Sequence, residues 1–313
     1  MKYVLKKTGL LLVSLLLISV LAFLAFSVIP GDPATKILGT QYTPERAEQL
    51  REELGLNRSL VERYLSWLSD FVRGDPGTSY NYFIPVREVL SGKIQVTVAL
   101  SLISWLIIVL TGLPLGVFMA KEQRPRLGRF GIVSNQVVMA VPPFFMGILL
   151  TYFFGLILKL FTPGNFPGFE ESLPQTLFYL LFPALAIALP KAAGVAKMLR
   201  SSILKEMRLD YVRTAYSRGN SRWDVIKNHV LRNAMLPVIT FLAMTMADAV
   251  AGSIIVEQVF ALPGLGRLLL ASIGNRDYPV AQCIVVMIAA LVVFMNYLAD
   301  IISQYVDPRV RLN

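Results

Sequence analysis

Few side chains in this chain could take part in bond-making chemistry. The 313 residues include one histidine, His229, and one cysteine, Cys283. Together they cannot build a usual zinc site, and a single cysteine excludes an intrachain disulfide. The sequence contains no G-x-x-x-x-G-K-[S/T], H-E-x-x-H or G-x-S-x-G motif, so it lacks a P-loop and the signatures of common hydrolases. We therefore expect a protein that is not an enzyme and holds no cofactor or metal of its own, with His229 in a surface or packing role.

Asp248 is the acidic residue whose position is most unusual. It lies near the middle of an apolar run, Ala234–Val256, where a charge costs about 2.5–3.5 kcal/mol on insertion scales. Such residues usually face a bundle interior or a water-filled cavity. Two interpretations stay open: Asp248 contacts a substrate in a pathway, or it makes an interhelical hydrogen bond. Lys191, Asn296 and Asp300 lie nearer the predicted cytoplasmic ends of their runs, where snorkelling explains a polar side chain.

A polar, basic segment, Asp210–Thr240, interrupts two hydrophobic runs. Its first part, Tyr211–Ser217, predicts a short helix closed by Arg218-Gly219, because glycine accepts the left-handed conformation that ends helices. A second helical stretch, Arg222–Asn233, leads into Leu236-Pro237 and the next apolar run. The segment has the form of a structured handle outside a membrane.

The elements that must position these residues are membrane helices. The chain is 55% hydrophobic and 16% charged, against a charged share of about 25% in soluble domains. Six apolar runs are long enough to cross a hydrocarbon core of roughly 30 Å. They are Gly9–Ile29, Gln95–Ala120, Phe130–Leu158, Thr176–Leu199, Ala234–Val256 and Val280–Ser303. The first is longer than a usual signal-peptide core, so we expect it to be retained. Prolines inside the runs, including Pro114, Pro142-Pro143 and Pro183, indicate bent helices.

The distribution of charge predicts the orientation. With the N-terminus inside, nineteen of the thirty Lys and Arg lie in cytoplasmic segments with only five acids. The positive-inside rule then places both termini and the Asp210–Thr240 segment in the cytoplasm. The same rule accounts for the net charge of +10, so the charge gives no support for nucleic-acid binding.

The predicted organisation has three parts. Residues 1–29 form the first membrane helix, residues 30–94 a helical external segment, and residues 95–313 a five-helix core with a cytoplasmic loop at 200–233. In the external segment, Thr43-Pro44 starts a helix and Ser59 opens a second one with a capping box. The second helix carries an apolar stripe that we expect to pack on the membrane helices or the lipid interface, with partner binding as the alternative. This stripe consists of Val61, Tyr64, Leu65, Leu68, Phe71 and Val72.

A further loop, from Glu257 to Pro279, has turn signals at Pro263-Gly264-Leu265-Gly266 and at Gly274-Asn275. Between them the apolar stretch Leu268–Ile273 predicts a short external helix. Contact with an external protein and a place at the lipid interface both remain open for it.

The basic segment also carries a family resemblance. Thr214-Ala215-x-x-x-Gly219, followed by Leu236-Pro237, resembles the EAA loop of permease subunits of ATP-binding-cassette (ABC) importers. Arg213 stands where the family motif begins with Glu. The gap from Gly219 to Leu236-Pro237 is longer than in the compact sugar-permease version and is similar to the subgroup that imports dipeptides, oligopeptides and nickel.

Other matches to that subgroup run the length of the chain. They are Pro30-Gly31-Asp32-Pro33, Leu54-Gly55-Leu56 with Tyr64 and Trp67, Gly74-Asp75-x-Gly77-x-Ser79, Pro85-Val86, Phe260-x-x-Pro263-Gly264-Leu265-Gly266-Arg267, Arg276-Asp277-Tyr278-Pro279 and Asp307-Pro308-Arg309. The combination resembles the first of the two permease subunits, the one with a large external segment after its first helix.

The resemblance implies an all-α membrane protein with the six-helix architecture of type I ABC importer permeases, in a bacterial or archaeal inner or plasma membrane. It implies a transport path shared with a paralogous permease, two cytoplasmic ATPase subunits that bind ATP and magnesium, and an external substrate-binding protein. Peptides are the cargo it favours, although nickel complexes and sugars stay open.

By the same resemblance, the Thr214–Gly219 helix is the coupling helix that seats in an ATPase cleft. The residues expected at this contact are Asp210, Arg213, Thr214, Ala215, Arg218, Gly219, Leu236 and Pro237. A small-residue face at Ala215 and Gly219 would allow close approach, and Arg213, Arg218 and Arg222 could meet acidic or backbone acceptors. Closure of the ATPase dimer would pull on this helix and, through Leu236-Pro237, on the fifth span.

Two functions from other classes remain as alternatives. One is a self-sufficient secondary transporter or channel that uses Asp248 for proton coupling, although we see no internal repeat. The other is a membrane-embedded scaffold protein. Uptake that needs neither ATP nor an ATPase subunit would favour the first of these over an importer permease.

Overall fold

The computed structural model describes residues 2–28, 32–122 and 125–306, in which helices joined by loops are the only regular elements. Five helices in these ranges are long and apolar enough to cross a membrane, and there are six such spans if the bent pair Arg126–Ala140 and Pro143–Ile157 is counted as one. The predicted all-α membrane fold is therefore confirmed. Pro30-Gly31, Arg124 and the C-terminal Asp307-Pro308-Arg309 lie outside the described residues.

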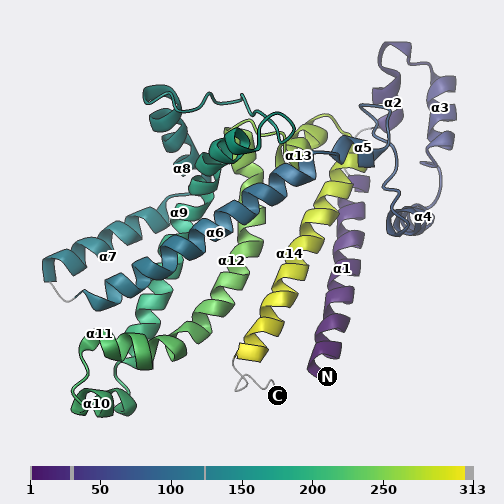
Figure 1. The fold of residues 1–313 in the computed structure, drawn as a ribbon. Coiled ribbons are helices and arrows are strands. Elements are labelled where there is room, and N and C mark those ends of the chain that lie inside the picture. Colours follow the sequence, from purple (N-terminus) through teal and green to yellow (C-terminus); the bar gives the residue numbers. More distant parts are fainter. Residues whose placement is uncertain (1, 29–31, 123–124, 307–313) are drawn as a thin grey trace. The chain divides into compact units, whose positions relative to one another are not determined.

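The chain divides into two compact units, and Figure 1 labels their helices. The first unit comprises residues 1–95 and 264–293. Its elements are α1 (Lys2–Val28), α2 (Pro33–Leu38), the 3₁₀ turn η1 (Gly39–Gln41), α3 (Pro44–Glu53), α4 (Leu60–Val72), α5 (Val86–Leu90), α13 (Leu265–Gly274) and the first part of α14 (Tyr278–Val306). A core of α5, α13 and α14 side chains holds it together, with Phe26 and Phe71 packed at its edge.

Helix α4 forms as the sequence predicts. Ser59 and Glu62 make the reciprocal capping box, and α4 packs on α1 through half of its apolar stripe. The Tyr64 hydroxyl lies 2.8 Å from Ser19 Oγ, and the Tyr64 ring meets the edge of Phe23. Val61, Leu65 and Val72 stay exposed. The expected packing on a membrane helix is confirmed for the inward half of the stripe.

A buried carboxylate fixes the loop that follows α4. Ser79 Oγ donates a hydrogen bond to Asp277, and the backbone N–H of Tyr80 donates to Asp277 Oδ1 at 3.0 Å. Asp277 is 1% exposed and stands just before α14. The sequence motif around Asp277 was visible as a family match, but its partner lies 198 residues away and only the structure identifies it.

The second unit comprises residues 96–263 and 294–313. Its elements are α6 (Lys93–Lys121), α7 (Pro125–Ala140), α8 (Pro143–Leu150), the π-helical turn η2 (Thr151–Ile157), α9 (Leu173–Glu206), α10 (Asp210–Ser217), α11 (Arg222–Val225), the π-helical turn η3 (Ile226–Val230) and α12 (Leu231–Val259). Helix α9 packs along α12 and also contacts α7 and α8.

Two glycines bring α6 close to α9. A Cβ at Gly112 would lie 3.0 Å from the carbonyl oxygen of Ala192, and one at Gly116 would lie 2.9 Å from that of Ala196. The Gly112-x-x-x-Gly116 spacing puts both on one face, where small residues let membrane helices approach closely. The tight contact positions α9, which is followed in the chain by α10.

Three details of the predicted elements change. The run Phe130–Leu158 is two helical segments that bend by 101° at the break before Pro143, because proline cannot continue the hydrogen-bonding of the preceding helix. Helix α9, in contrast, continues through Pro183 and Pro190. The prediction that Glu257 begins an external loop is wrong, because Glu257 is a fully buried residue of α12. The short helix predicted in this segment does form, as α13.

Candidate functional site

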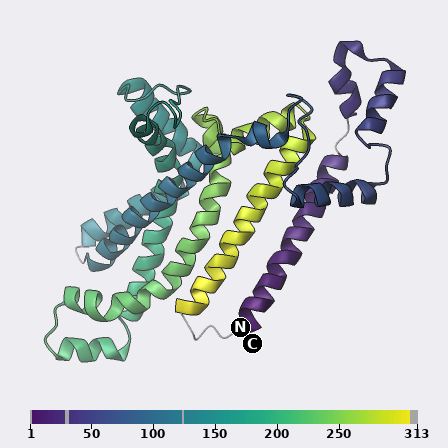
Figure 2. The same cartoon turned by 45° about the vertical axis from the view of Figure 1, so that its right-hand side comes forward.

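Helix α10 is the short helix that the basic segment predicts. It runs from Asp210 to Ser217, with Asp210 in the first turn, where a carboxylate favours the helix dipole. It ends as expected: Gly219 has φ of +82° and its N–H donates to the carbonyl of Tyr216 at 2.9 Å. Figures 1 and 2 both place α10 and α11 at one end of α9 and α12, with α8 toward the other end.

The two faces of α10 differ in burial. Val212 and Ala215 are 1% and 5% exposed and join a core that includes Leu199, Ile203 and Val225. Arg213, Thr214, Arg218 and Gly219 are exposed. The expectation of one small-residue contact face is therefore wrong in part, because Ala215 packs inside the unit while Gly219 faces outward. The exposed face is polar and basic.

Polar contacts attach α10 to its own unit. The Tyr211 hydroxyl donates to Glu206 Oε2 at 2.7 Å, and Asn220 Nδ2 donates to the carbonyl of Ala215 at 3.0 Å. Burial, together with the hydrogen bond to Glu206, raises the pKa of Tyr211 above its usual value. Helix α10 is thus held at the end of α9 by side chains as well as by its apolar face.

The basic side chains of the segment have different surroundings. Arg222 Nη2 donates to the carbonyl of Ala120 at 3.0 Å, and Lys121 lies 4.6 Å from the centroid of the Trp223 ring. Arg222 thus binds the C-terminal end of α6 rather than being held ready for an external acceptor. Arg213 makes only a loose ion pair with Asp210 at 3.4 Å, and both side chains are more than 80% exposed.

Leu236 and Pro237 lie within α12. Leu236 is partly buried and Pro237 is exposed. The π-helical turn η3 precedes them, and Pro237 removes one backbone N–H from the helix ladder. A π-turn followed by proline is a frequent cause of bending. A turn at residues 218–221 separates α10 from α11, and from α11 into α12 the chain is helical but interrupted at η3 and at Pro237.

Asp248 forms an ion pair with Lys191. Lys191 Nζ lies 2.6 Å from Asp248 Oδ2 and joins the middle of α9 to α12. The side chains are 32% and 56% exposed in this chain. The interhelical hydrogen bond that one interpretation foresaw is therefore present. Lys191 therefore has an ion-pair partner on α12, whereas snorkelling explained its polar side chain from the sequence alone.

A second carboxyl group of α12 has an opposite environment. Glu257 is 0% exposed and accepts a hydrogen bond from Thr97 Oγ1 at 2.6 Å. Sequence reasoning missed this site because Glu257 falls at the edge of the apolar run Ala234–Val256. Thr97 lies 160 residues away, in the second apolar run, and no local signal pairs it with Glu257.

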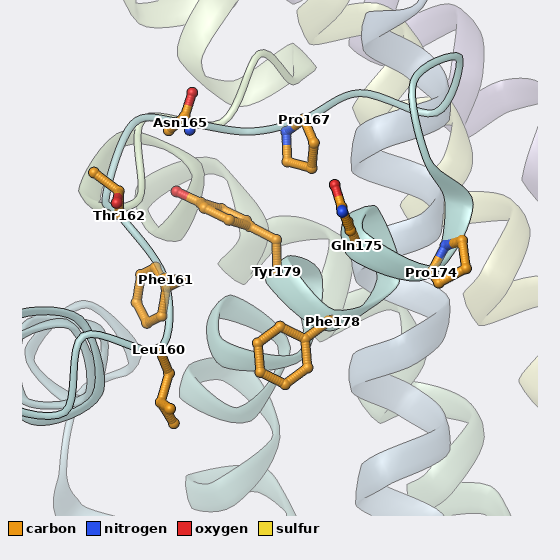
Figure 3. Close-up of a pocket in the computed structure, with 9 residues that line it drawn as sticks. All are labelled: Leu160, Phe161, Thr162, Asn165, Pro167, Pro174, Gln175, Phe178 and Tyr179. Carbon is orange, nitrogen blue, oxygen red and sulfur yellow. The ribbon is translucent and has the colours of Figure 1, made fainter.

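A cavity of about 380 Å³ lies at the start of α9. Figure 3 shows its lining, with the rings of Phe161, Phe178 and Tyr179 and the amides of Asn165 and Gln175. The Tyr179 hydroxyl accepts from the N–H of Gly164 at 3.0 Å and donates to the carbonyl of Phe260 at 3.1 Å. These bonds fix the loop that forms the cavity wall.

The two remaining candidates for chemistry are His229 and Cys283. His229 is exposed on η3, and Cys283 is buried with its Sγ 3.7 Å from Met287 Sδ. In the part of the chain that the structure describes, no three His, Cys, Asp or Glu side chains gather where a metal could bind. The candidate functional groups of the second unit are the polar side chains of α10 and the carboxyl groups of Asp248 and Glu257 on α12.

Two family models match the sequence. The one described as "binding-protein-dependent transport system inner membrane component" covers residues 112–312, and its N-terminal counterpart covers residues 1–101. Together they cover all of the chain except residues 102–111 and 313, including α10 and α12.

The chain is also similar in sequence to relatives along almost its whole length, and similar in fold to a solved transporter structure. The chain is 34% identical to the oligopeptide transport system permease protein AppB of Bacillus subtilis, with 98% of each chain covered. It is 31% identical to a "probable peptide ABC transporter permease protein" of Sinorhizobium fredii, with 99% covered. A structure of the MetNI methionine ABC transporter in inward-facing conformations matches with a TM-score of 0.57 at 17% identity, covering 70% of this chain and 96% of that one. This likeness supports the type I permease fold.

Proposed function

The chain belongs to the family of binding-protein-dependent transport system inner membrane components, the permeases of bacterial ABC importers, and on that premise we propose that it imports di- or oligopeptides. The full-length similarity to permeases named for peptide transport supports this cargo. The chain forms half of the translocation path, and a paralogous permease forms the other half.

The observation that carries the coupling role is the two-sided burial of α10. Val212 and Ala215 fix one face to the end of α9 and α12, while Arg213, Thr214 and Arg218 present a polar face outward. A helix with this construction transmits a push or pull from a partner to the spans behind it. The coupling contact accordingly uses Asp210, Arg213, Thr214, Arg218 and Gly219.

The partner at this surface is an ATPase. Because the sequence lacks a P-loop, ATP and magnesium bind to separate cytoplasmic subunits, two per importer, and this chain is not itself an enzyme. Arginine suits the contact, since its guanidinium binds carboxylates and backbone carbonyls in a fixed geometry. Arg213 replaces the family's Glu and reverses the charge at that point of the contact.

Motion then passes along the chain from α10 to α12. Ala215 anchors the inner face of α10, and η3 and Pro237 lie between α10 and the membrane part of α12. Closing of the ATPase dimer shifts α10, and the two interruptions let α12 change its direction relative to η3. The fifth span thereby alternates the side on which the path is open.

The proposed orientation of the chain in the membrane follows from its basic residues. The excess of basic residues around 200–233 places α10 and both termini in the cytoplasm. Residues 30–94 and α13 are then external, where the substrate-binding protein docks. The five-helix core from 95 onward carries the path.

The exposed face of α12 is the side proposed to face the path. Met244, Asp248, Ala251 and Ile255 are all exposed and recur at intervals of three or four residues. A charge at this depth is costly against lipid, so this face meets water or protein. The Lys191–Asp248 pair gives the path one positive and one negative group.

The sharpest test replaces Gly219. No heavy atom lies within 4 Å of a Cβ built there, so Gly219→Trp places its ring outward from the coupling surface. We expect the variant to insert and to keep ATP hydrolysis by the complex, while ATP-driven peptide uptake in proteoliposomes falls at least about tenfold. Gly219→Ala is the matched control, because its Cβ meets the same backbone strain at a φ of +82° but adds no ring.

Two outcomes would contradict the proposal. Normal coupling in Gly219→Trp would remove α10 from the ATPase contact, and uptake without ATP or ATPase subunits would exclude an ABC importer. The cargo is checked separately: the binding protein that copurifies with the chain should hold a peptide, identified by mass spectrometry.

A further inference from the structure

The C-terminal end of α6 is attached to the segment that follows α10. Arg222 Nη2 donates a hydrogen bond to the carbonyl oxygen of Ala120 at 3.0 Å, and Lys121 Nζ lies 4.6 Å from the centroid of the Trp223 ring. Ala120 and Lys121 are the last two residues of α6, and Arg222 and Trp223 are the first two of α11. We call these two contacts the α6 clamp.

The chemistry of the α6 clamp suits the end of a helix. The last four carbonyl groups of an α-helix have no N–H partner within the helix, and the helix dipole places partial negative charge there. The guanidinium of Arg222 satisfies both, and its planar donors fix the direction of the contact. Trp223 is 40% exposed and Lys121 is exposed as well. This second pair is therefore a cation–π contact at the surface, outside the apolar core.

Apolar packing joins the same elements beneath the α6 clamp. Ala120 is 2% exposed and belongs to one core with Val212 and Ala215 of α10 and Val225 of α11. Val117, about one turn earlier on α6, packs against that core. A displacement of α10 and α11 therefore acts on α6 through a packed core as well as through the two polar contacts.

Helix α6 is also attached to α12 at two points farther from the α6 clamp. Trp105 Nε1 donates a hydrogen bond to the carbonyl oxygen of Leu242 at 3.0 Å. Near the other end of α6, Thr97 Oγ1 donates to Glu257 at 2.6 Å. One helix thus contacts α11 at its C-terminal end and α12 at two places along its length.

Helix α6 is the less interrupted of the two routes toward this part of α12. It runs for 29 residues, through Pro114, as one α-helix, which corresponds to roughly 43 Å. The chain from α11 into α12 contains the π-helical turn η3 and then Pro237. Bending at these two interruptions would absorb a displacement of α11, whereas α6 would carry it to Leu242 and Glu257.

We propose that Arg222 and Trp223 are positioning residues, and that α6 is a second route by which movement of α10 reaches α12. The inference rests on the proposed contact of α10 with an ATPase. On this route, the ATPase moves α10 and α11, and the α6 clamp moves α6 with them. Trp105 and Thr97 then move the part of α12 that carries Asp248.

The test measures peptide uptake and ATP hydrolysis by the complex in proteoliposomes, together with its thermal unfolding midpoint in detergent. Arg222→Met keeps the length of the side chain but removes its donors, so uptake per ATP hydrolysed should fall about fivefold. Arg222→Lys can still donate to the carbonyl of Ala120 and should recover most of the coupling. Arg129→Met, which replaces an exposed arginine on α7, is the matched control and should couple normally.

Trp223→Leu tests the second contact of the α6 clamp without touching the first. It removes the ring that Lys121 approaches and keeps an apolar side chain, so uptake per ATP hydrolysed should fall about twofold. The unfolding midpoint should stay near that of the wild type, because the Trp223 ring is 40% exposed.

A covalent tether separates a role in transmission from a role in stability. In a Cys283→Ala background, Arg222→Met is combined with Lys121→Cys and Trp223→Cys, which removes the α6 clamp and lets a short bismaleimide join α6 to α11. Uptake per ATP hydrolysed should be low before cross-linking and should recover after it. N-ethylmaleimide modifies both thiols without joining them, so it is the control and should restore nothing.

Three results would overturn the proposal. Normal coupling in both Arg222→Met and Trp223→Leu would exclude the α6 clamp from transmission, while uncoupling by Gly219→Trp would leave the ATPase contact of α10 intact. Uptake and ATP hydrolysis that fall together with the unfolding midpoint would assign Arg222 to the fold alone. Uptake that stays low with the tether in place would show that α6 has to separate from α11 during transport.

Discussion

Two carboxyl groups on α12 stand nine positions apart and have opposite environments. Glu257 is fully buried and accepts a hydrogen bond from Thr97 of α6. Asp248 is more than half exposed and pairs with Lys191 of α9. One helix therefore carries an acid that is sealed inside the unit and another that is accessible at membrane depth.

The difference separates a structural role from a functional one. A buried acid with a fixed partner joins helices, and removing it leaves a polar group unpaired. The Lys191–Asp248 pair is 32% and 56% exposed in the single chain, so packing within the unit does not explain two charges in the span, where each is costly against lipid. We infer that Glu257 holds α6 and α12 together, and that Asp248 acts on what passes along the exposed face of α12.

The largest expected effect is on Glu257. Glu257→Ala removes the acceptor of the Thr97 hydroxyl and leaves a cavity, so it should lower the free energy of unfolding by about 3 kcal/mol. The measurement is the thermal unfolding midpoint of the complex in detergent, together with the amount of folded protein recovered.

Glu257→Gln is the matched control, because its amide carbonyl can still accept from Thr97, and it should retain most of the stability. The assignment of a structural role would be wrong if Glu257→Ala and Asp248→Ala lowered the midpoint equally.

Asp248→Asn should show the opposite pattern. The variant removes the negative charge but keeps an oxygen that can accept from Lys191, so the unfolding midpoint should fall less than in Glu257→Ala. Peptide uptake in proteoliposomes should fall about tenfold, equivalent to about 1.4 kcal/mol, with ATP hydrolysis by the complex preserved.

The double variant Asp248→Lys, Lys191→Asp tests whether the pair or each position matters. Restored uptake would mean that the path needs one charge of each sign at this depth. Unchanged uptake in Asp248→Asn would leave only the interhelical hydrogen bond as the role of Asp248.

The sequence predicted the helices and their ends more reliably than the contacts between distant side chains. Apolar runs and caps report local preferences, so the spans, the capping box at Ser59 and the end of α10 at Gly219 could be predicted. Pairings across distant segments could not, because neither Lys191 nor Thr97 carries a local signal for its partner on α12. Glu257 was misplaced for the same reason.

The sequence indicated that prolines would bend helices, but it did not indicate which prolines would do so. Pro143 follows a 101° break, whereas Pro183 and Pro190 lie in a continuous α9. Neighbouring helices decide whether a freed carbonyl is tolerated. In α10, likewise, periodicity gave the helix but the identity of the buried face came from its neighbours, since Ala215 packs against the core while Gly219 stays outside.

The smallest expected effect concerns the exposed face of α10. As on α12, the buried side chains should support the fold and the exposed ones should serve function. Arg213→Ala removes a side chain that is 81% exposed and loosely paired with Asp210, so the unfolding free energy should change by less than about 0.5 kcal/mol. If Arg213 contacts the ATPase, uptake per ATP hydrolysed should fall by about two- to fivefold in proteoliposomes. Arg126→Ala, an exposed arginine on α7, is the control and should leave coupling unchanged.

Coupling that is normal in Arg213→Ala while Arg218→Ala impairs it would shift the contact toward the C-terminal end of α10. A lowered unfolding midpoint in Arg213→Ala would instead show that the exposed face, like Val212 and Ala215, supports the fold.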